Sequence, residues 1–230
     1  GGVADRIVAA QAAFDFGARK DEIERRLGIE INDSMTSGEI ESLGADRGAG
    51  GGAGQATSGV LTPGMDSLLR FISAEEAPKG YNQVFSGSKL DLPKPLTSMT
   101  IGEVVEWQAA NRAAGAESGA AGRYQFMPDT LLETADRLGM GRDTVFSPET
   151  QDRLAADLLD QAGYNQFVSG AIPVETFANR VAGRWAALPM LSGDNEGLSA
   201  HHGVGSNRAT TSSAEFRAAV EGARAMDMAA

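Results

Sequence analysis

The sequence contains no cysteine, which excludes disulfide bonds, thiolate metal sites and thiol catalysis. It also lacks any apolar run near the roughly 20 residues that a membrane-spanning helix needs, so we expect no membrane partner. Aromatic residues make up only 6% of the chain, although 42% of it is hydrophobic. This balance indicates an alanine-rich and mostly helical protein.

Basic residues are scarce relative to acidic ones, with 20 Lys and Arg against 31 Asp and Glu and a formal net charge of -11. A chain this acidic is a poor partner for a phosphate backbone, so we expect no nucleic-acid binding. His201 and His202 are chain neighbours with no carboxylate at ligand spacing, and the glycine-rich stretch lacks the Lys-Ser/Thr of a phosphate loop. We therefore expect no cofactor and no metal.

The chain divides into three parts by composition. Residues 1–43 carry apolar side chains at near-helical spacing and predict a helical N-terminal appendage, which we expect to dock to a larger protein or a phage particle. Residues 44–59 are rich in glycine and predict a flexible linker. Residues 60–230 form the main domain.

The main domain reads as a mostly helical α+β fold. Thr62-Pro63 is typical of a helix start, and Thr100 with Glu103 and Ser212 with Glu215 each match a capping box. Further helices are predicted at about 129–139, 148–163, 173–186 and 213–227. Residues 77–97, rich in Gly, Pro and Ser, predict a small β-hairpin flanking a cleft.

Residues 118–126 read Ser-Gly-Ala-Ala-Gly-Arg-Tyr-Gln-Phe. The small residues let the backbone approach another surface, while Arg123, Tyr124 and Gln125 offer polar groups that suit a sugar-binding floor. The alternative is a turn leading into a helix that starts with Pro128.

Four segments in order resemble the phage lambda endolysin type of lysozyme-like enzymes. They are the run ending in Glu75-Glu76, residues 118–126, residues 146–152 and residues 184–189. The resemblance covers about residues 65–225 and implies a lysozyme-like fold. It also implies cleavage of peptidoglycan glycan strands, by the lytic transglycosylase reaction of the lambda branch.

Glu76 is our candidate catalytic acid. It lies four residues beyond Ile72 on the apolar stripe of the predicted helix, where burial would raise the pKa of a carboxyl group. In the family the acid ends the first helix of the domain, a few residues before a pair such as Tyr81-Asn82, and that register favours Glu76 over Glu75.

The resemblance also implies a set of substrate-binding residues. These are Tyr81, Arg123, Tyr124 and Gln125. Two alternatives stay open, because Tyr124 can equally be a packed aromatic with a satisfied hydroxyl, and Arg123 can pair with a helix carboxylate.

The second carboxylate decides the reaction, because hydrolases of this kind commonly use a pair. In the phage T4 type of lysozyme an Asp and a Thr follow the Glu at fixed spacing, but those positions hold Phe85 and Asp91 here. Asp91 and Glu117 remain candidates without a motif. We therefore expect a lytic transglycosylase that forms a 1,6-anhydro product at the MurNAc–GlcNAc bond.

Two alternatives remain open: a water-using muramidase on the same fold, or a non-catalytic wall-binding or virion structural protein. For the enzyme we expect action on the cell wall in the periplasm, with the protein either virion-associated or exported.

Overall fold

The computed structural model describes residues 61–204 and 207–229, all of which belong to a compact unit running from Ala56 to Ala230. The predicted N-terminal appendage (1–43) and the linker (44–59) lie outside the described residues. The main domain is mostly helical, as the sequence predicts.

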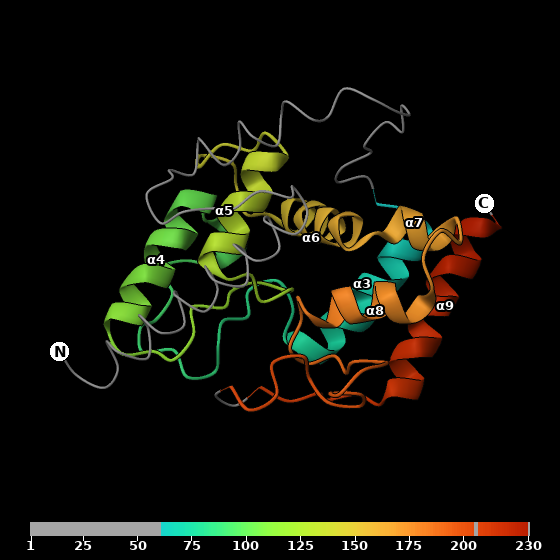
Figure 1. The fold of residues 1–230 in the computed structure, drawn as a ribbon. Helices are drawn as coiled ribbons and strands as arrows, with labels where there is room; N and C mark the ends of the chain where they lie inside the picture. The colour runs from blue at the N-terminus through green and yellow to red at the C-terminus, as the bar shows by residue number, and fades with distance from the viewer. Residues whose placement is uncertain (1–60, 205–206, 230) are drawn as a thin grey trace, which may run out of the picture. The chain divides into compact units, whose positions relative to one another are not determined.

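The described part of the chain contains seven α-helices and one short 3-10 helix. Figure 1 shows how the α-helices are arranged. The α-helices are α3 (Pro63–Glu76), α4 (Ile101–Ala113), α5 (Pro128–Arg137), α6 (Pro148–Ala162), α7 (Tyr164–Val168), α8 (Val174–Ala182) and α9 (Ser213–Met228), and the 3-10 helix η1 spans Leu96–Ser98.

Side chains that accept backbone hydrogen bonds fix where several helices begin. The Thr62 side chain accepts from the Met65 N–H at the start of α3. Both predicted capping boxes are present, Thr100 with Glu103 on α4 and Ser212 with Glu215 on α9. These caps satisfy N–H groups that lack a partner inside the helix, which explains why the sequence predicts these starts well.

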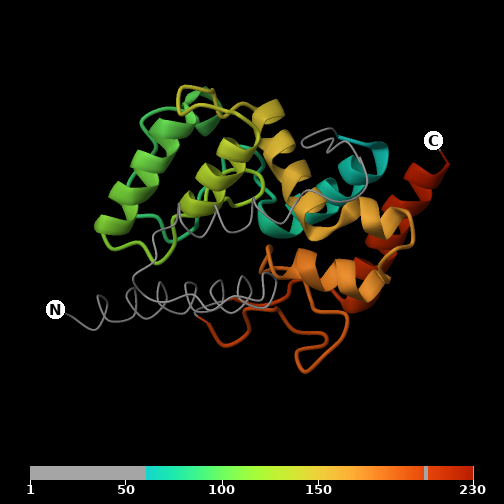
Figure 2. The same cartoon turned by 45° about the horizontal axis from the view of Figure 1, so that its top comes forward.

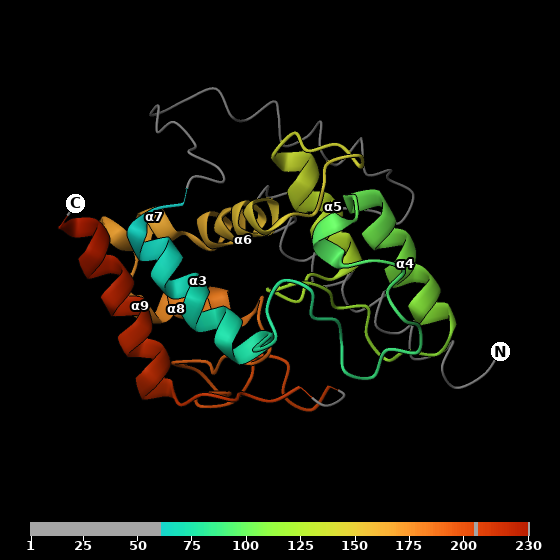
Figure 3. The same cartoon turned by 180° about the vertical axis from the view of Figure 1, so that it is seen from behind.

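The helices form two groups joined by α6. α4 packs on α5 in one group, and α3, α7, α8 and α9 pack together in the other. α6 contacts α5 on one side and α3, α7 and α8 on the other, and Figures 2 and 3 show it passing between the two groups. The chain crosses from the second group to the first in the segment that follows Glu76.

The segment between α3 and α4 differs from our prediction. No β-hairpin forms across residues 77–97; Val84 makes a single bridge to Ala121, and η1 follows. Pro93 and Pro95 cannot donate ladder hydrogen bonds, and Gly80 turns the chain at φ 85°. The segment therefore stays extended and irregular.

α8 also differs from prediction, since it ends at Ala182 rather than near residue 186. Trp185 lies beyond the end of the helix and is nonetheless buried, with 3% of its surface exposed. Because the helix stops early, the backbone that follows Trp185 turns back toward the end of α3. This turn brings Ala187 to Glu76.

Candidate active site

Glu76 is the last residue of α3, and its side chain reaches a loop more than 100 residues away along the chain. The Ala187 N–H donates to Glu76 Oε1 at 2.9 Å. One carboxyl oxygen is therefore held by a backbone donor. On the main chain, Gln83 Nε2 lies 3.4 Å from the Glu76 carbonyl oxygen and ties the following segment to the helix end.

The environment raises the pKa of Glu76 above its ordinary value of 4.5. Burial is the largest cause, because it disfavours the charged form; the nearby charge of Glu75 adds to it, and the Ala187 hydrogen bond opposes it. The carboxyl group consequently keeps its proton to a higher pH than an exposed glutamate does. A general acid needs this property.

Glu75 has a different environment, although it is the neighbouring residue. Its Oε2 accepts a hydrogen bond from Thr210 Oγ1 at 2.6 Å, and the Thr210 N–H donates to the Ala187 carbonyl at 2.9 Å. Both glutamates therefore meet the segment around Ala187, but only Glu76 is held by its N–H.

Three of the predicted substrate-binding residues lie together, around a carboxylate that the sequence analysis did not single out. Asp152 of α6 accepts from the Tyr81 hydroxyl at 2.9 Å and from the Tyr124 hydroxyl at 2.6 Å. Arg123 Nη1 donates to the Tyr81 hydroxyl at 2.5 Å and lies 3.4 Å from Asp152 Oδ1. The Arg123 guanidinium stands 4.8 Å from the centre of the Tyr81 ring, in cation–π geometry.

The structure shows the surroundings of the two residues for which the sequence left alternatives open. Arg123 does pair with a helix carboxylate, Asp152. Tyr124 is a packed aromatic with 2% of its surface exposed, and burial together with its bond to Asp152 raises the pKa of its hydroxyl. Trp185 Nε1 donates to the Tyr124 carbonyl at 3.1 Å. Arg123 and Tyr81 remain half-buried and face the solvent in part.

Gln125 shapes the turn in which it lies. It has a positive φ of 49°, and its Nε2 donates to the Gly122 carbonyl at 2.9 Å and lies 3.4 Å from the Gln83 carbonyl. Since Gln83 also contacts the end of α3, Gln125 belongs to the backbone network next to Glu76.

Gln151 is a second residue that the sequence analysis did not single out. It is fully buried; its Oε1 accepts from the Arg123 N–H at 2.9 Å, and its Nε2 donates to the Tyr81 and Phe146 carbonyls at 3.2 and 3.1 Å. Gln151 and Asp152 both lie in the segment 146–152 that carries the family resemblance. The resemblance of that segment could have drawn attention to Gln151 and Asp152. Only the fold shows which residues they contact.

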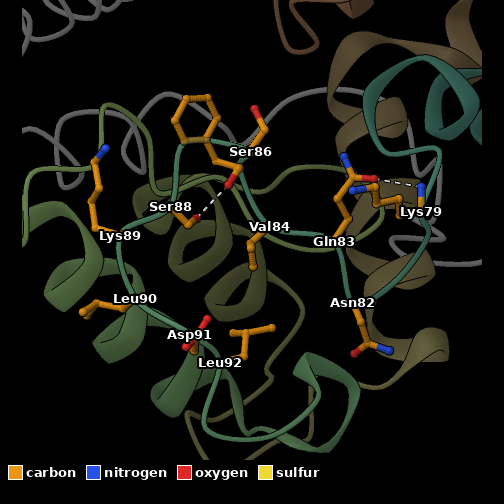
Figure 4. Close-up of a pocket in the computed structure, with 11 residues that line it drawn as sticks. Lys79, Asn82, Gln83, Val84, Ser86, Ser88, Lys89, Leu90, Asp91 and Leu92 are labelled. Atoms are coloured by element: carbon orange, nitrogen blue, oxygen red, sulfur yellow. Dashed lines mark hydrogen bonds between the residues drawn. The ribbon is translucent and has the colours of Figure 1, made fainter.

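An open groove of about 560 Å³ follows the chain beyond Glu76 (Figure 4). Its lining mixes apolar, amide, hydroxyl and charged side chains, all from the segment between α3 and α4. The residues are Lys79, Asn82, Gln83, Val84, Phe85, Ser86, Ser88, Lys89, Leu90, Asp91 and Leu92. Gln83 connects this groove to the helix end that carries Glu76.

Within residues 61–204 and 207–229 no group of three or more His, Cys, Asp or Glu side chains is arranged to hold a metal ion. His201 Nε2 instead lies 3.0 Å from the Gly183 carbonyl. In the same part of the chain no helix combines the length and apolar character that a bilayer crossing requires.

The helical fold and the half-buried carboxyl group at the end of α3 are compatible with a lysozyme-like, wall-degrading enzyme. The family model described as Endolysin matches residues 73–204, more than half of the 230-residue chain. The chain therefore belongs to the Endolysin family. Comparisons with curated proteins and with solved structures gave no match.

Membership of this family implies degradation of peptidoglycan, and so action on the bacterial cell wall. The matched range includes Glu76, Tyr81, Arg123, Tyr124 and Gln125. The expected substrate class and the phage association of the family are thereby supported.

Proposed function

We propose that this endolysin is a lytic transglycosylase that cleaves the MurNAc–GlcNAc bond, with Glu76 as general acid and then general base. The observation that carries the proposal is the half-buried Glu76 side chain, whose pKa is raised and one of whose oxygens is held by the Ala187 N–H. We assign the proton that is transferred to the other oxygen, Oε2.

The reaction follows in two steps. Glu76 donates its proton to the glycosidic oxygen, the bond to the muramoyl anomeric carbon breaks, and the GlcNAc-bearing strand leaves as an alcohol. The 6-hydroxyl of the same muramoyl residue then attacks the anomeric carbon, and the Glu76 carboxylate accepts its proton. The product is a 1,6-anhydro sugar and the acid is regenerated. The intramolecular attack benefits from a high effective concentration.

The sequence pattern around Glu76 supports this one-carboxylate mechanism. The charge of Glu75 adds to the rise in the pKa of Glu76. Asp91 lies in the groove segment and Glu117 follows α4, and neither belongs to a two-carboxylate motif with Glu76. The missing T4-type spacing and the lambda-type resemblance agree with this assignment.

We assign the predicted substrate-binding residues two kinds of role. Tyr81 and Arg123, half-buried and locked to Asp152, form a preorganised wall that contacts the substrate. Tyr124 and Gln125 support that wall, Tyr124 through Asp152 and Gln125 through the turn it closes. Preorganisation of this kind lowers the cost of binding an ordered sugar chain.

The proposed function is tested by Glu76→Gln. This change keeps the size of the side chain and its acceptor oxygen for Ala187 but removes the transferable proton. We expect cell-wall clearing to fall by about 10²–10⁴-fold, the usual contribution of a general acid. Glu196→Gln, at an exposed loop position, is the matched control and should leave clearing unchanged.

Mass analysis of digested glycan separates the mechanisms. Anhydro-muramoyl ends support the transglycosylase, whereas reducing ends, heavier by one water, would assign a muramidase instead. Equal clearing by the wild type and Glu76→Gln, or no clearing by either, would reject catalysis by Glu76 and leave a wall-binding or virion structural role.

We further propose that the enzyme reaches the periplasmic wall either as part of a phage particle or by export. The family's phage association supports this proposal, and residues 1–43 are the proposed docking segment.

A further inference from the structure

Lysines are unusually concentrated beside the candidate active site. The chain has four lysines in total, and three of them, Lys79, Lys89 and Lys94, fall within 16 residues of sequence. Lys79 and Lys89 line the groove, while Lys94 pairs with Glu103 at 2.9 Å. The groove is therefore locally basic in a protein with a net charge of -11.

The two groove lysines have no ion-pair partner among the described residues, in contrast to Lys94. Both are exposed. The one carboxylate in the groove lining is Asp91, so the lining carries a net charge of +1. An unpaired ammonium group on the rim of a concave surface is available to an anionic ligand.

The backbone that carries each lysine is anchored. The Lys79 N–H donates to Gln83 Oε1 at 2.8 Å, and Gln83 in turn contacts the end of α3. The Lys89 and Leu90 N–H groups both donate to Oδ1 of Asn111, a fully buried residue of α4, at 2.8 and 3.1 Å. The positions of both lysines are therefore set by the fold.

The lining between the lysines suits a sugar chain. In Figure 4, Lys79 and Lys89 stand at opposite ends of the segment, with Val84 between them. Apolar side chains can contact the CH faces of sugar rings, and the amide, hydroxyl and carboxylate groups among the lining residues can bind sugar hydroxyls.

We propose that this groove is a substrate subsite in which Lys79 and Lys89 bind carboxylates carried by the glycan strand. The ligand class is a carboxylate-bearing sugar polymer, so the subsite distinguishes peptidoglycan from neutral polymers of N-acetylglucosamine. The carboxylate can belong to the peptide stem or, where the stem is absent, to the lactyl group. This proposal rests on the glycan-cleaving function proposed above.

The test measures binding to the full chain in a Glu76→Gln background, so that ligands stay intact. Three probes are compared: a MurNAc–GlcNAc hexasaccharide with peptide stems, the same glycan without stems, and chitohexaose, which has no carboxylate. We expect Lys79→Gln/Lys89→Gln to weaken binding of the stem-bearing glycan by about three- to tenfold at low salt, while chitohexaose binding changes less than about twofold.

Weaker binding of the stem-bearing glycan alone would identify stem carboxylates as the ligand, and weaker binding of both muramoyl glycans would identify the lactyl group. Equal loss for all three probes, or no loss for any, would overturn the proposal. Lys94→Gln is the matched control and should leave all three affinities unchanged. Lys79→Arg/Lys89→Arg should retain binding, which separates loss of charge from misfolding.

Failure of the proposed function remains distinguishable from failure of this inference. Catalysis is measured by wall clearing with the wild type, whereas the lysine comparison needs only binding.

Discussion

At the scale of single residues, Glu75 and Glu76 show how one position along a helix changes the chemistry of a side chain. Glu76 continues the stripe of Leu69 and Ile72, both buried, and meets a backbone donor from the loop after α8. Glu75 reaches the hydroxyl of Thr210 instead. The helix thus delivers one carboxyl group to a poorly solvated position and leaves its neighbour hydrogen-bonded near the surface.

The raised pKa of Glu76 predicts a pH-dependent stability difference. Because the folded protein binds this proton more tightly than the unfolded chain does, the contribution of Glu76 to stability is fully present below 4.5 and is lost as pH rises through the folded pKa. Glu76→Gln does not titrate. We therefore expect the variant to gain stability relative to the wild type as the pH rises above 4.5, measured by urea unfolding at a series of pH values.

Glu196→Gln again serves as control and should show no such gain, since Glu196 is exposed. A Glu76→Gln variant whose stability relative to the wild type does not rise with pH would contradict the burial of this carboxyl group.

At the scale of elements, a side chain near the C-terminus of α9 binds the N-terminus of α3. Asp227 accepts from the Gly64 N–H at 2.7 Å and from the Tyr164 hydroxyl at 2.7 Å, and it also accepts from the Thr62 hydroxyl. A negative group at a helix start is favourable because free N–H groups point toward it. The helix that ends in Glu76 is therefore fixed at its beginning by the last helix of the chain.

Glycine at position 64 is required by this close contact. A Cβ added there would lie 2.2 Å from the Ala223 carbonyl oxygen and 2.3 Å from the Tyr164 hydroxyl. We expect Gly64→Ala to lower the free energy of unfolding by about 1–3 kcal/mol, the usual cost of overpacking, as measured by urea denaturation.

Gly222 on α9 is the matched control, because a Cβ there meets nothing within 4 Å. Gly222→Ala should stabilise the protein by about 0.5–1 kcal/mol through helix propensity alone. Equal effects of the two changes would show that α3 and α9 do not pack as described.

At the scale of the whole described domain, α6 holds the two helix groups together. It carries Asp152 to the cluster with Tyr81 and Arg123, and farther along it carries Asp157, which is fully buried. Asp157 Oδ2 pairs with Arg137 of α5 at 2.7 Å. A buried carboxylate left without its cation is costly, so this pair ties α5 to α6.

Arg137→Met should therefore destabilise the protein by ~2 kcal/mol in urea unfolding, somewhat below the cost of breaking a fully buried pair because Arg137 is partly exposed. Arg217→Met, which removes the half-exposed ion pair with Glu175, is the control and should have little effect. A loss no larger than that of the control would contradict a structural role for the α5–α6 pair.

Much of the domain was predictable because its signals are local. The start of α3 at Thr62-Pro63 and the capping boxes at Thr100 and Ser212 follow from hydrogen bonds within one helical turn. The hairpin expected at 77–97 was wrong, because the glycines and prolines that mark a turn do not specify whether the flanking segments pair.

The candidate site was proposed from similarly local signals. The apolar stripe of α3 points to Glu76, and the resemblance carried by residues 118–126 points to Arg123 and Tyr124. No local pattern indicates that Asp152, on a helix far along the chain, binds the side chains of all three cluster residues.

The sequence by itself determined that the protein is acidic, helical and free of thiol chemistry, and which glutamate ends the first helix of the domain. Only the tertiary structure decided that this glutamate meets the Ala187 N–H and that the two groove lysines have no ion-pair partner among the residues the structure describes. The physical reason is range: capping and amphipathic spacing act within a few residues, whereas burial and charge pairing depend on segments that only the folded chain brings together.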